Sequence, residues 1–265
     1  MDLGFKDKVA LVTGAGSQIG FGKEIALLLA KEGCEKIAVT DINLEDTKKT
    51  ADAIKKLGRN VIAVKADITK KAEISAMVEK VIFAYAKIDI LCNVAGGILH
   101  KDNVPLENQQ DEIWAKQMSL NLYGTMLVTQ AVLPRMKERK YGVIVNIGSG
   151  STHQLSMGVG MYAISKSAID LFTKQLAFTE AKNGIRVNCI APGPAPTNFG
   201  AILREGMPAP TEEQAKQMRE AMARSMPLGR IGTAADIAYA TAFLASDLTS
   251  YVTGQVFNVS GGSVM

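Results

Sequence analysis

Short runs of β-branched and apolar residues alternate along the chain with longer stretches whose apolar residues recur at helical spacing. Seven runs predict strands, several of them apolar almost throughout, as is typical of strands covered on both faces: residues 8–13, 36–41, 61–65, 88–93, 143–147, 186–191 and 256–259. Helices are predicted between them at residues 23–31, 44–57, 71–85, 110–137 and 160–182. The alternation predicts an α/β fold, a single domain over residues 1–265 with a doubly wound parallel sheet and helices on both faces.

One stretch, residues 193–228, departs from this alternation. It holds prolines at positions 194, 196, 208, 210 and 227 and methionines at 207, 218, 222 and 226, with one short helix predicted at 212–224. We expect a mobile lid that carries substrate selectivity, because recognition residues concentrate on such excursions. The alternative is a surface excursion with no ligand role.

Composition and charge narrow the function classes. The chain of 265 residues is 47% hydrophobic and 21% charged, and its formal net charge of +4 is not gathered into a basic block, so nucleic-acid binding gains no support. Its three cysteines are far apart and lack metal-ligand spacing; Cys92 and Cys189 lie in apolar runs, which predicts buried thiols and no metal site. No signal-peptide pattern and no membrane-spanning apolar run is present, so we expect a cytoplasmic protein.

A glycine-rich turn connects the first predicted strand to the first helix. Glycines in residues 14–22 would allow a tight turn and let backbone amides approach a pyrophosphate at the helix N-terminus, as in a Rossmann-type nucleotide site. Asp41 ends the second strand, where a carboxylate can bind ribose hydroxyls and repel a 2′-phosphate. The nearest basic residues are Lys48 and Lys49 on the next helix, so NAD is favoured over NADP. The alternatives are a turn without a ligand and an aspartate that only caps the next helix.

Tyr162 and Lys166 are the candidate reactive pair. They are four residues apart, so on a helix they share one face, and Ser149 stands thirteen residues upstream. A phenol with a pKa of about 10 is a poor base at neutral pH, and a nearby ammonium favours its ionised form. Beside a nucleotide-binding turn, this pair indicates proton-coupled hydride transfer.

These residues together resemble the short-chain dehydrogenase/reductase superfamily, in its single-domain branch, over essentially the whole chain. The landmarks occur in the family's order: Thr13-Gly14, Gly20-Phe21-Gly22, Asp67-Ile68, residues 93–96, Asn121, Ser149, Tyr162, Lys166, Pro192-Gly193, Thr197, and the closing stretches 229–232 and 254–262.

Two positions depart from the family pattern. The usual turn, T-G-x3-G-x-G, would place Gln18 at the middle glycine; counting back from Gly33 instead makes Gly22 the final glycine of a longer T-G-x5-G-x-G turn. Ser260 stands where many relatives carry Asp, which we expect to affect C-terminal packing more than chemistry.

The resemblance implies a role for each landmark. Tyr162 would be the general acid/base, Lys166 would lower its pKa and hold the nicotinamide ribose, Ser149 would bind the substrate oxygen, and Asn121 would help to hold a proton-relaying water. The implied cofactor-binding residues are Gly14, Ser17, Gln18, Gly20, Phe21, Gly22, Asp41, Ile42, Asp67, Ile68, Asn93, Ala95, Gly96, Tyr162, Lys166, Pro192, Gly193, Ala195 and Thr197. His153 would lie on the substrate side with Ser149 and Tyr162, although a solvated loop histidine explains it equally; His100 is assigned to the surface.

The leading hypothesis is therefore an NAD-dependent dehydrogenase of a secondary alcohol, or a ketone reductase in reverse. The first alternative is a 3-oxoacyl-ACP or 3-oxoacyl-CoA reductase, for which Arg204, Lys216 and Arg219 would supply a basic entrance. The second is a catalytically silent NAD-binding protein, whose signature would be loss of Tyr162 or Lys166. The resemblance further suggests a homotetramer with helices 110–137 and 160–182 at one interface.

Overall fold

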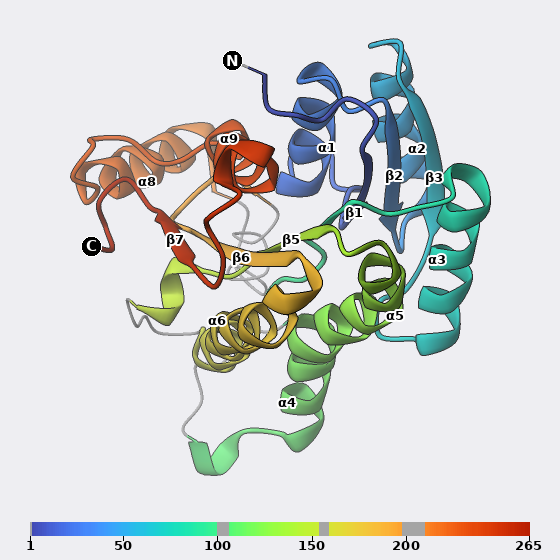
Figure 1. Cartoon of the computed structure of the whole chain (residues 1–265). Coiled ribbons are helices and arrows are strands. Elements are labelled where there is room, and N and C mark those ends of the chain that lie inside the picture. The colour runs from blue at the N-terminus through green and yellow to red at the C-terminus, as the bar shows by residue number, and fades with distance from the viewer. Residues whose placement is uncertain (1, 100–105, 154–158, 198–209) are drawn as a thin grey trace.

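A computed structural model of the chain describes residues 2–99, 106–153, 159–197 and 210–265. Its centre is a seven-stranded sheet in the order β3-β2-β1-β4-β5-β6-β7, with every neighbouring pair parallel (Figure 1). The strands are β1 Val9–Thr13, β2 Lys36–Asp41, β3 Asn60–Lys65, β4 Ile90–Asn93, β5 Gly142–Ile147, β6 Ile185–Pro192 and β7 Val256–Val259. All seven overlap the predicted runs, and the expected doubly wound parallel sheet is confirmed.

Helices cover both faces of the sheet (Figure 1). On one face lie α1 (Phe21–Lys31), α2 (Leu44–Lys55) and α9 (Ala234–Ala245), and on the other α3 (Lys71–Tyr85), α5 (Gly124–Arg139) and α6 (Gly160–Glu180). The central strand β1 shows why both are needed, because Ala10 and Val12 pack into one core and Val9 and Leu11 into the other. Two cores thus hold the sheet between them.

The predicted helix over residues 110–137 is wrong as a single element. It consists of α4 (Asp111–Met118), a π-helical turn (Ser119–Tyr123) and α5. The π turn opens the backbone at Asn121, and the Thr125 hydroxyl donates to the Asn121 carbonyl oxygen at 2.9 Å. Such turns often mark functional sites, and this one contains a predicted catalytic residue.

Helix α9 was not predicted from the sequence. It packs along α1, and Ile237, Ala238 and Ala242 are almost fully buried there. Its local signal is a capping box, in which the Thr233 side chain and Asp236 satisfy each other's backbone amides at the first turn. That signal fixes where a helix starts, but the burial that stabilises it depends on α1, which is about two hundred residues away in the sequence.

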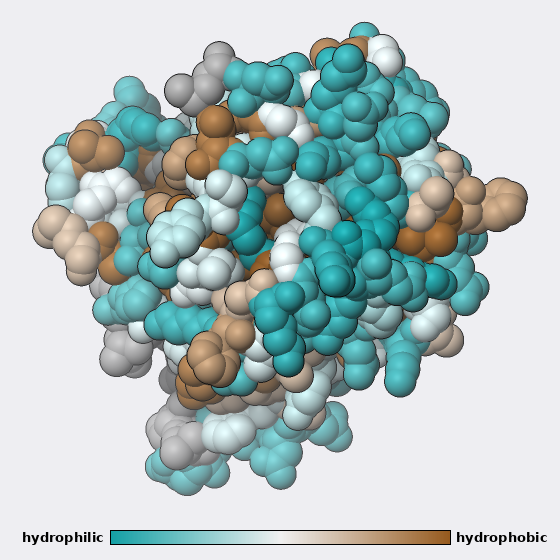
Figure 2. Space-filling view, in the orientation of Figure 1, coloured by the Kyte–Doolittle hydropathy of each residue, from teal (hydrophilic) through white to brown (hydrophobic). Residues whose placement is uncertain are grey.

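Helix α8 (Glu212–Arg224) matches the predicted helix inside the 193–228 stretch. It has no buried residue, and Met218 and Met222 are 49% and 46% exposed. Hydrophobic residues lie among hydrophilic ones at the surface on this side of the molecule (Figure 2). Residues 198–209 of the predicted lid, Arg204 among them, lie outside the described residues, as does His100.

The strand order places one natural binding site at the carboxyl edge of the sheet. From β1 the chain proceeds to β2 and β3 on one side, whereas β4, β5 and β6 add on the other, so the order reverses between β1 and β4. Ligands of open α/β sheets bind outside the strand ends at such a reversal. No helix among the described residues is long and apolar enough to cross a membrane.

Candidate active site

The glycine turn after β1 leaves no room for side chains where it meets its neighbours. Gly14 has a φ of +66°, and a Cβ there would lie 2.6 Å from the Ala95 nitrogen. A Cβ on Gly22, inside the first turn of α1, would collide with the Gly14 carbonyl oxygen. Gly20 is the N-cap of α1. Gly22 is therefore the close-contact glycine between helix and turn, as the longer-turn interpretation requires.

Gln18 lies in this turn, and its side chain is hydrogen-bonded within the protein. Its amide nitrogen donates to the Gly16 carbonyl at 2.8 Å and to the Asp46 carbonyl at 3.0 Å, and Lys23 donates to its amide oxygen at 2.9 Å. The side chain thus links the turn to α2. The structure shows that this amide stabilises the lengthened turn, and the cofactor contact expected for Gln18 stays a prediction.

Asp41 lies beside the same turn at the end of β2. Its carboxylate accepts hydrogen bonds from the Gly16 amide at 2.9 Å and the Asn43 amide at 3.1 Å. A Cβ on Gly16 would lie 2.7 Å from the Asp41 carboxyl carbon, so turn and carboxylate are in close contact. Ile42, next in sequence, is 62% exposed. The carboxylate therefore stands where a ligand held by the turn would meet it.

The turn after β4 is tied to the glycine turn by Thr13. The Thr13 hydroxyl accepts hydrogen bonds from the Val94 and Ala95 amides at 3.0 and 3.1 Å. Asn93 behaves differently from the expectation that it lines the cofactor cleft, because its side chain is 3% exposed and donates to Thr129 and Asn146 in the interior. Asn93 therefore orders the strand ends from within, whereas Ala95 and Gly96 lie at the edge.

Two more predicted cofactor residues follow β3. Partial burial works to raise the pKa of Asp67, but hydrogen bonds from Thr69 and the charge of Lys70 hold it below its ordinary value. Ile68 is buried and packs closely on Gly124, since a Cβ on Gly124 would lie 2.7 Å from the Cδ1 atom of Ile68. Asp67 thus remains ionised at this edge of the sheet, and Ile68 packs against the first residue of α5.

Ser149 and Tyr162 meet where β5 ends and α6 begins. The Ser149 oxygen accepts from the Ser151 amide at 3.2 Å and the Ser151 hydroxyl at 2.9 Å, which leaves its own proton to donate. Burial raises the pKa of Tyr162 to about 12, and the hydrogen bond from Ser149 acts in the opposite direction. A lowering of this pKa by Lys166 was predicted, but Lys166 is not among the causes of the shift, which is set by desolvation of the phenolate and by Ser149.

Lys166 lies beneath the Tyr162 ring, with its nitrogen 5.9 Å from the ring centroid. This nitrogen donates to the Ile147 carbonyl oxygen at 2.7 Å, and a Cβ on Gly96 would lie 3.4 Å from it. Lys166 is 4% exposed, and burial lowers its pKa to about 8. The α6 helix thus brings tyrosine and lysine to one face, next to the turn after β4.

Asn121 completes this arrangement from the π turn. Its side-chain oxygen accepts from the Gly97 amide at 2.8 Å, and its nitrogen donates to the Gly97 carbonyl and to Ser165, each at 3.0 Å. The residue is fully buried. The side chain therefore holds the turn after β4 against α6, a task that the sequence did not reveal.

The turn after β6 closes the other side. Gly193 donates its amide to Val259 at 2.9 Å, and a Cβ on it would lie 2.7 Å from the Ser260 Cα. Ser260 is 6% exposed and accepts from the Val264 amide at 3.2 Å, which agrees with a packing role. Pro192, Ala195 and Thr197 lie along this turn, and His153 is exposed beside the Ser149 segment.

Sequence reasoning missed Asp170, one helical turn beyond Lys166. Its carboxylate is 9% exposed, and its charge works to raise the pKa of Lys166 against the effect of burial. A Cβ on Gly148 would lie 2.8 Å from both the Asp170 carboxylate and the Cys189 sulfur. The i, i+4 spacing from Lys166 was the available signal. The three cysteines are free buried thiols, as predicted for Cys92 and Cys189.

Comparison with known proteins identifies the family of the chain. The family described as enoyl-(acyl carrier protein) reductase matches residues 14–263. A 3-oxoacyl-[acyl-carrier-protein] reductase of Thermotoga maritima is 37% identical over 97% of this chain and 98% of its own. A 7α-hydroxysteroid dehydrogenase solved with NADH and 7-oxo glycochenodeoxycholic acid superposes with a TM-score of 0.88 at 34% identity, covering 99% of this chain and 96% of that one.

An NAD⁺-bound xylitol dehydrogenase superposes with a TM-score of 0.87 at 30% identity, covering 97% of this chain and 99% of that one. The family match, the full-length relatives and the order of the strands agree. The chain belongs to the short-chain dehydrogenase/reductase superfamily and is an oxidoreductase of that family.

Proposed function

We propose that this protein is an NAD-dependent dehydrogenase of a secondary alcohol, or a ketone reductase in the reverse direction, with Tyr162 as general acid/base. The observation that carries the proposal is the placement of a buried Tyr162 between a donating Ser149 and the Lys166 ammonium, next to the glycine turn. Two structural neighbours hold NAD⁺ or NADH. One acts on a polyol and the other was solved with a 7-oxo steroid, so neither assigns the substrate.

The cofactor pocket fits NAD on three features of this chain. The glycine turn is compact enough for backbone amides to approach a pyrophosphate, and the Asp41 carboxylate stands beside it. The nearest lysines on α2 are paired within that helix, Lys48 with Glu45 and Lys49 with Asp46, each at 2.7 Å. A 2′-phosphate would therefore meet the Asp41 carboxylate and would have to compete with these ion pairs for a cation.

In this proposal the residues divide the work of alcohol oxidation. The bound nicotinamide supplies the hydride acceptor. Ser149 donates a hydrogen bond to the substrate oxygen, and Tyr162 removes the hydroxyl proton. Lys166 relays protons between Tyr162 and the side of the site where Asn121 lies. Because burial favours the neutral phenol, Tyr162 is well suited to donate a proton in ketone reduction, and oxidation should accelerate as the pH rises.

The remaining finer assignments are part of the same proposal. Ser17, Gly20, Phe21, Ile42, Ile68, Ala195 and Thr197 are proposed to line the cofactor, and residues 193–228, with the methionine face of α8, to cover the substrate. A 3-oxoacyl thioester is the alternative substrate, favoured by the Thermotoga maritima relative and by exposed Lys216 and Arg219 on α8. A cytoplasmic location stays a prediction of the sequence.

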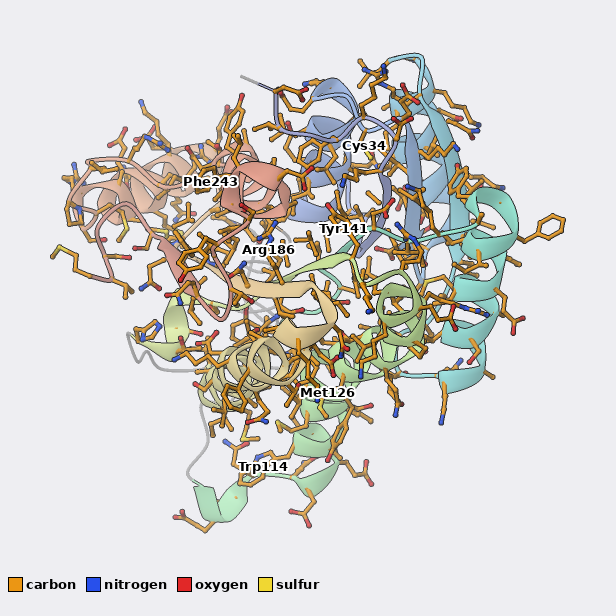
Figure 3. The ribbon with its side chains drawn as sticks, viewed as in Figure 1. Cys34, Trp114, Met126, Tyr141, Arg186 and Phe243 are labelled. Atoms are coloured by element: carbon orange, nitrogen blue, oxygen red, sulfur yellow. The ribbon has the colours of Figure 1, made fainter. Side chains whose placement is uncertain are left out.

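We also propose a homotetramer that uses α5 and α6. The two helices flank an exposed hollow of about 460 Å³, lined mainly by apolar side chains. The apolar lining side chains include Met126, labelled in Figure 3, together with Leu127, Leu133, Phe172 and Leu176. Exposed apolar surface of this kind marks association sites, and a second copy of the chain would cover it.

The deciding experiment measures initial rates of NAD and NADP reduction with cyclohexanol, butan-2-ol, xylitol and 3-hydroxybutyryl-CoA, with Tyr162→Phe as the blank. NAD-selective turnover that disappears in the variant supports the proposal, and the fastest alcohol identifies the substrate class. Turnover confined to 3-hydroxybutyryl-CoA supports the acyl reductase. NAD binding without turnover of any alcohol would indicate a silent NAD-binding protein.

A further inference from the structure

Gln117 is a buried amide that the proposed chemistry does not use. It lies in the last turn of α4, one helical turn before Asn121, and is 2% exposed. Its nitrogen donates to the Gly97 carbonyl at 2.7 Å, and its oxygen accepts from the Leu99 amide at 2.9 Å. Burying an amide is unfavourable unless both its ends are paired, and here both ends bind the same short segment.

Gln117 and Asn121 act on this segment together. Asn121 also donates to the Gly97 carbonyl and accepts from the Gly97 amide, so the carbonyl receives two hydrogen bonds and the amides of Gly97 and Leu99 each donate one. Two side-chain amides thus pair with the backbone of residues 97–99 much as a neighbouring strand would. The segment follows Gly96, which approaches both Lys166 and Asn121.

The residue between the two clamped positions faces the catalytic tyrosine. Ile98 forms a small cluster with Val159 and Tyr162, separate from the two main cores, and the three side chains are 5%, 5% and 8% exposed. Gln117 does not contact Tyr162 directly. It holds the backbone of residues 97–99, and this backbone positions the Ile98 side chain against Tyr162. A shift of residues 97–99 would move the apolar wall beside the Tyr162 ring, whereas the contact with the glycine turn is made by Val94 and Ala95, which hydrogen-bond to Thr13.

We propose that Gln117 is a positioning residue that holds the Gly97–Leu99 segment, so that Ile98 forms a fixed apolar wall against which the substrate carbon skeleton packs at Tyr162. The inference rests on the proposed dehydrogenase function. It makes substrate binding sensitive to an amide that contacts neither substrate nor cofactor. It also predicts a preference for substrates with an apolar group next to the reacting carbon.

The test replaces Gln117 with Met, which keeps the length of the side chain and removes both hydrogen bonds. Asn188→Leu is the matched control, because Asn188 is also a fully buried amide that clamps backbone, at Val252 and Gln255, at 2.9 and 3.0 Å. It lies within β6, outside the proposed site. Kinetics use the fastest alcohol of the panel, NADH affinity is measured by fluorescence titration, and hydrogen exchange is followed in a peptide covering residues 96–99.

For Gln117→Met we expect KM for the alcohol to rise about five- to tenfold, with kcat and the NADH Kd changed less than about threefold. Exchange at residues 97–99 should accelerate. Asn188→Leu should lose comparable thermal stability and keep KM. An unchanged KM in Gln117→Met overturns the inference, as does an equal rise in both variants. Failure of the proposed function is a distinct result, since the wild type would then show no Tyr162-dependent turnover. Unaltered hydrogen exchange at residues 97–99 in Gln117→Met would still refute the claim that Gln117 holds this segment.

Discussion

Lys166 should reduce the stability of the cofactor-free protein, and its replacement by Met should raise that stability while abolishing turnover. The lysine is 4% exposed, and burial lowers its pKa from 10.5 to about 8. At 1.36 kcal/mol for each pKa unit, this fall corresponds to a folding cost of about 3 kcal/mol for burying the ammonium at neutral pH.

The net effect of Lys166→Met is smaller than this cost. The substitution also removes the hydrogen bond to the Ile147 carbonyl, worth about 1 kcal/mol, and leaves the aliphatic stem nearly unchanged in volume. We therefore expect a gain of about 2 kcal/mol, or about 5 °C in Tm for a chain of this size.

The stability difference between the wild type and Lys166→Met should depend on pH, because the Lys166 pKa differs between the folded and unfolded chains. Below pH 8 both folded and unfolded chains carry the charge, so folding bears the full cost. Between about 8 and 10.5 the folded state is neutral while the unfolded chain still binds the proton, so wild-type stability gains with rising pH from this group. The advantage of Lys166→Met should therefore be largest at neutral pH and shrink through this window.

Thermal unfolding followed by circular dichroism at about pH 7 and about pH 9.5 measures the difference between the two proteins. Lys80→Met, at an exposed position of α3, controls for the general effect of exchanging lysine for methionine. The reasoning is refuted if Lys166→Met is less stable than the wild type at neutral pH, or if its advantage is the same at both pH values.

Two further predictions address the cofactor and the assembly. Asp41→Asn keeps an acceptor for the Gly16 amide but removes the charge. We therefore expect the Kd for NAD to rise about tenfold and the NADP/NAD ratio of kcat/KM to increase. An unchanged ratio in steady-state kinetics would show that Asp41 does not bind the ribose hydroxyls. Leu133→Glu places a charge in the hollow between α5 and α6 and should yield monomers or dimers in light scattering. Gln130 is exposed at the same hollow, so the control variant Gln130→Glu should affect assembly less. A tetramer in both variants would show that the interface lies elsewhere.

Local sequence patterns determined much of the fold and the candidate site. Strand and helix periods depend on nearest neighbours along the chain, so seven strands and the exact bounds of α3 and α8 follow from the sequence. The same holds for the spacing of Tyr162 and Lys166, because four residues on a helix always bring two side chains to one face. Gly22 could be placed by counting along the first helix, and the structure puts it in contact with Gly14.

Tertiary structure alone decided the features that depend on which distant segments meet. The direction of the Tyr162 pKa depends on how much protein covers its ring, which no local pattern encodes. Asn93 faces inward because Thr129 and Asn146 offer hydrogen bonds there, and α9 is stable because α1 buries its apolar face. Gln117 looks like an ordinary helical residue until residues 97–99 fold against it. Sequence spacing fixes which side chains share an element, whereas burial and hydrogen-bond partners come from segments far apart in the chain, and these determine what each side chain can do.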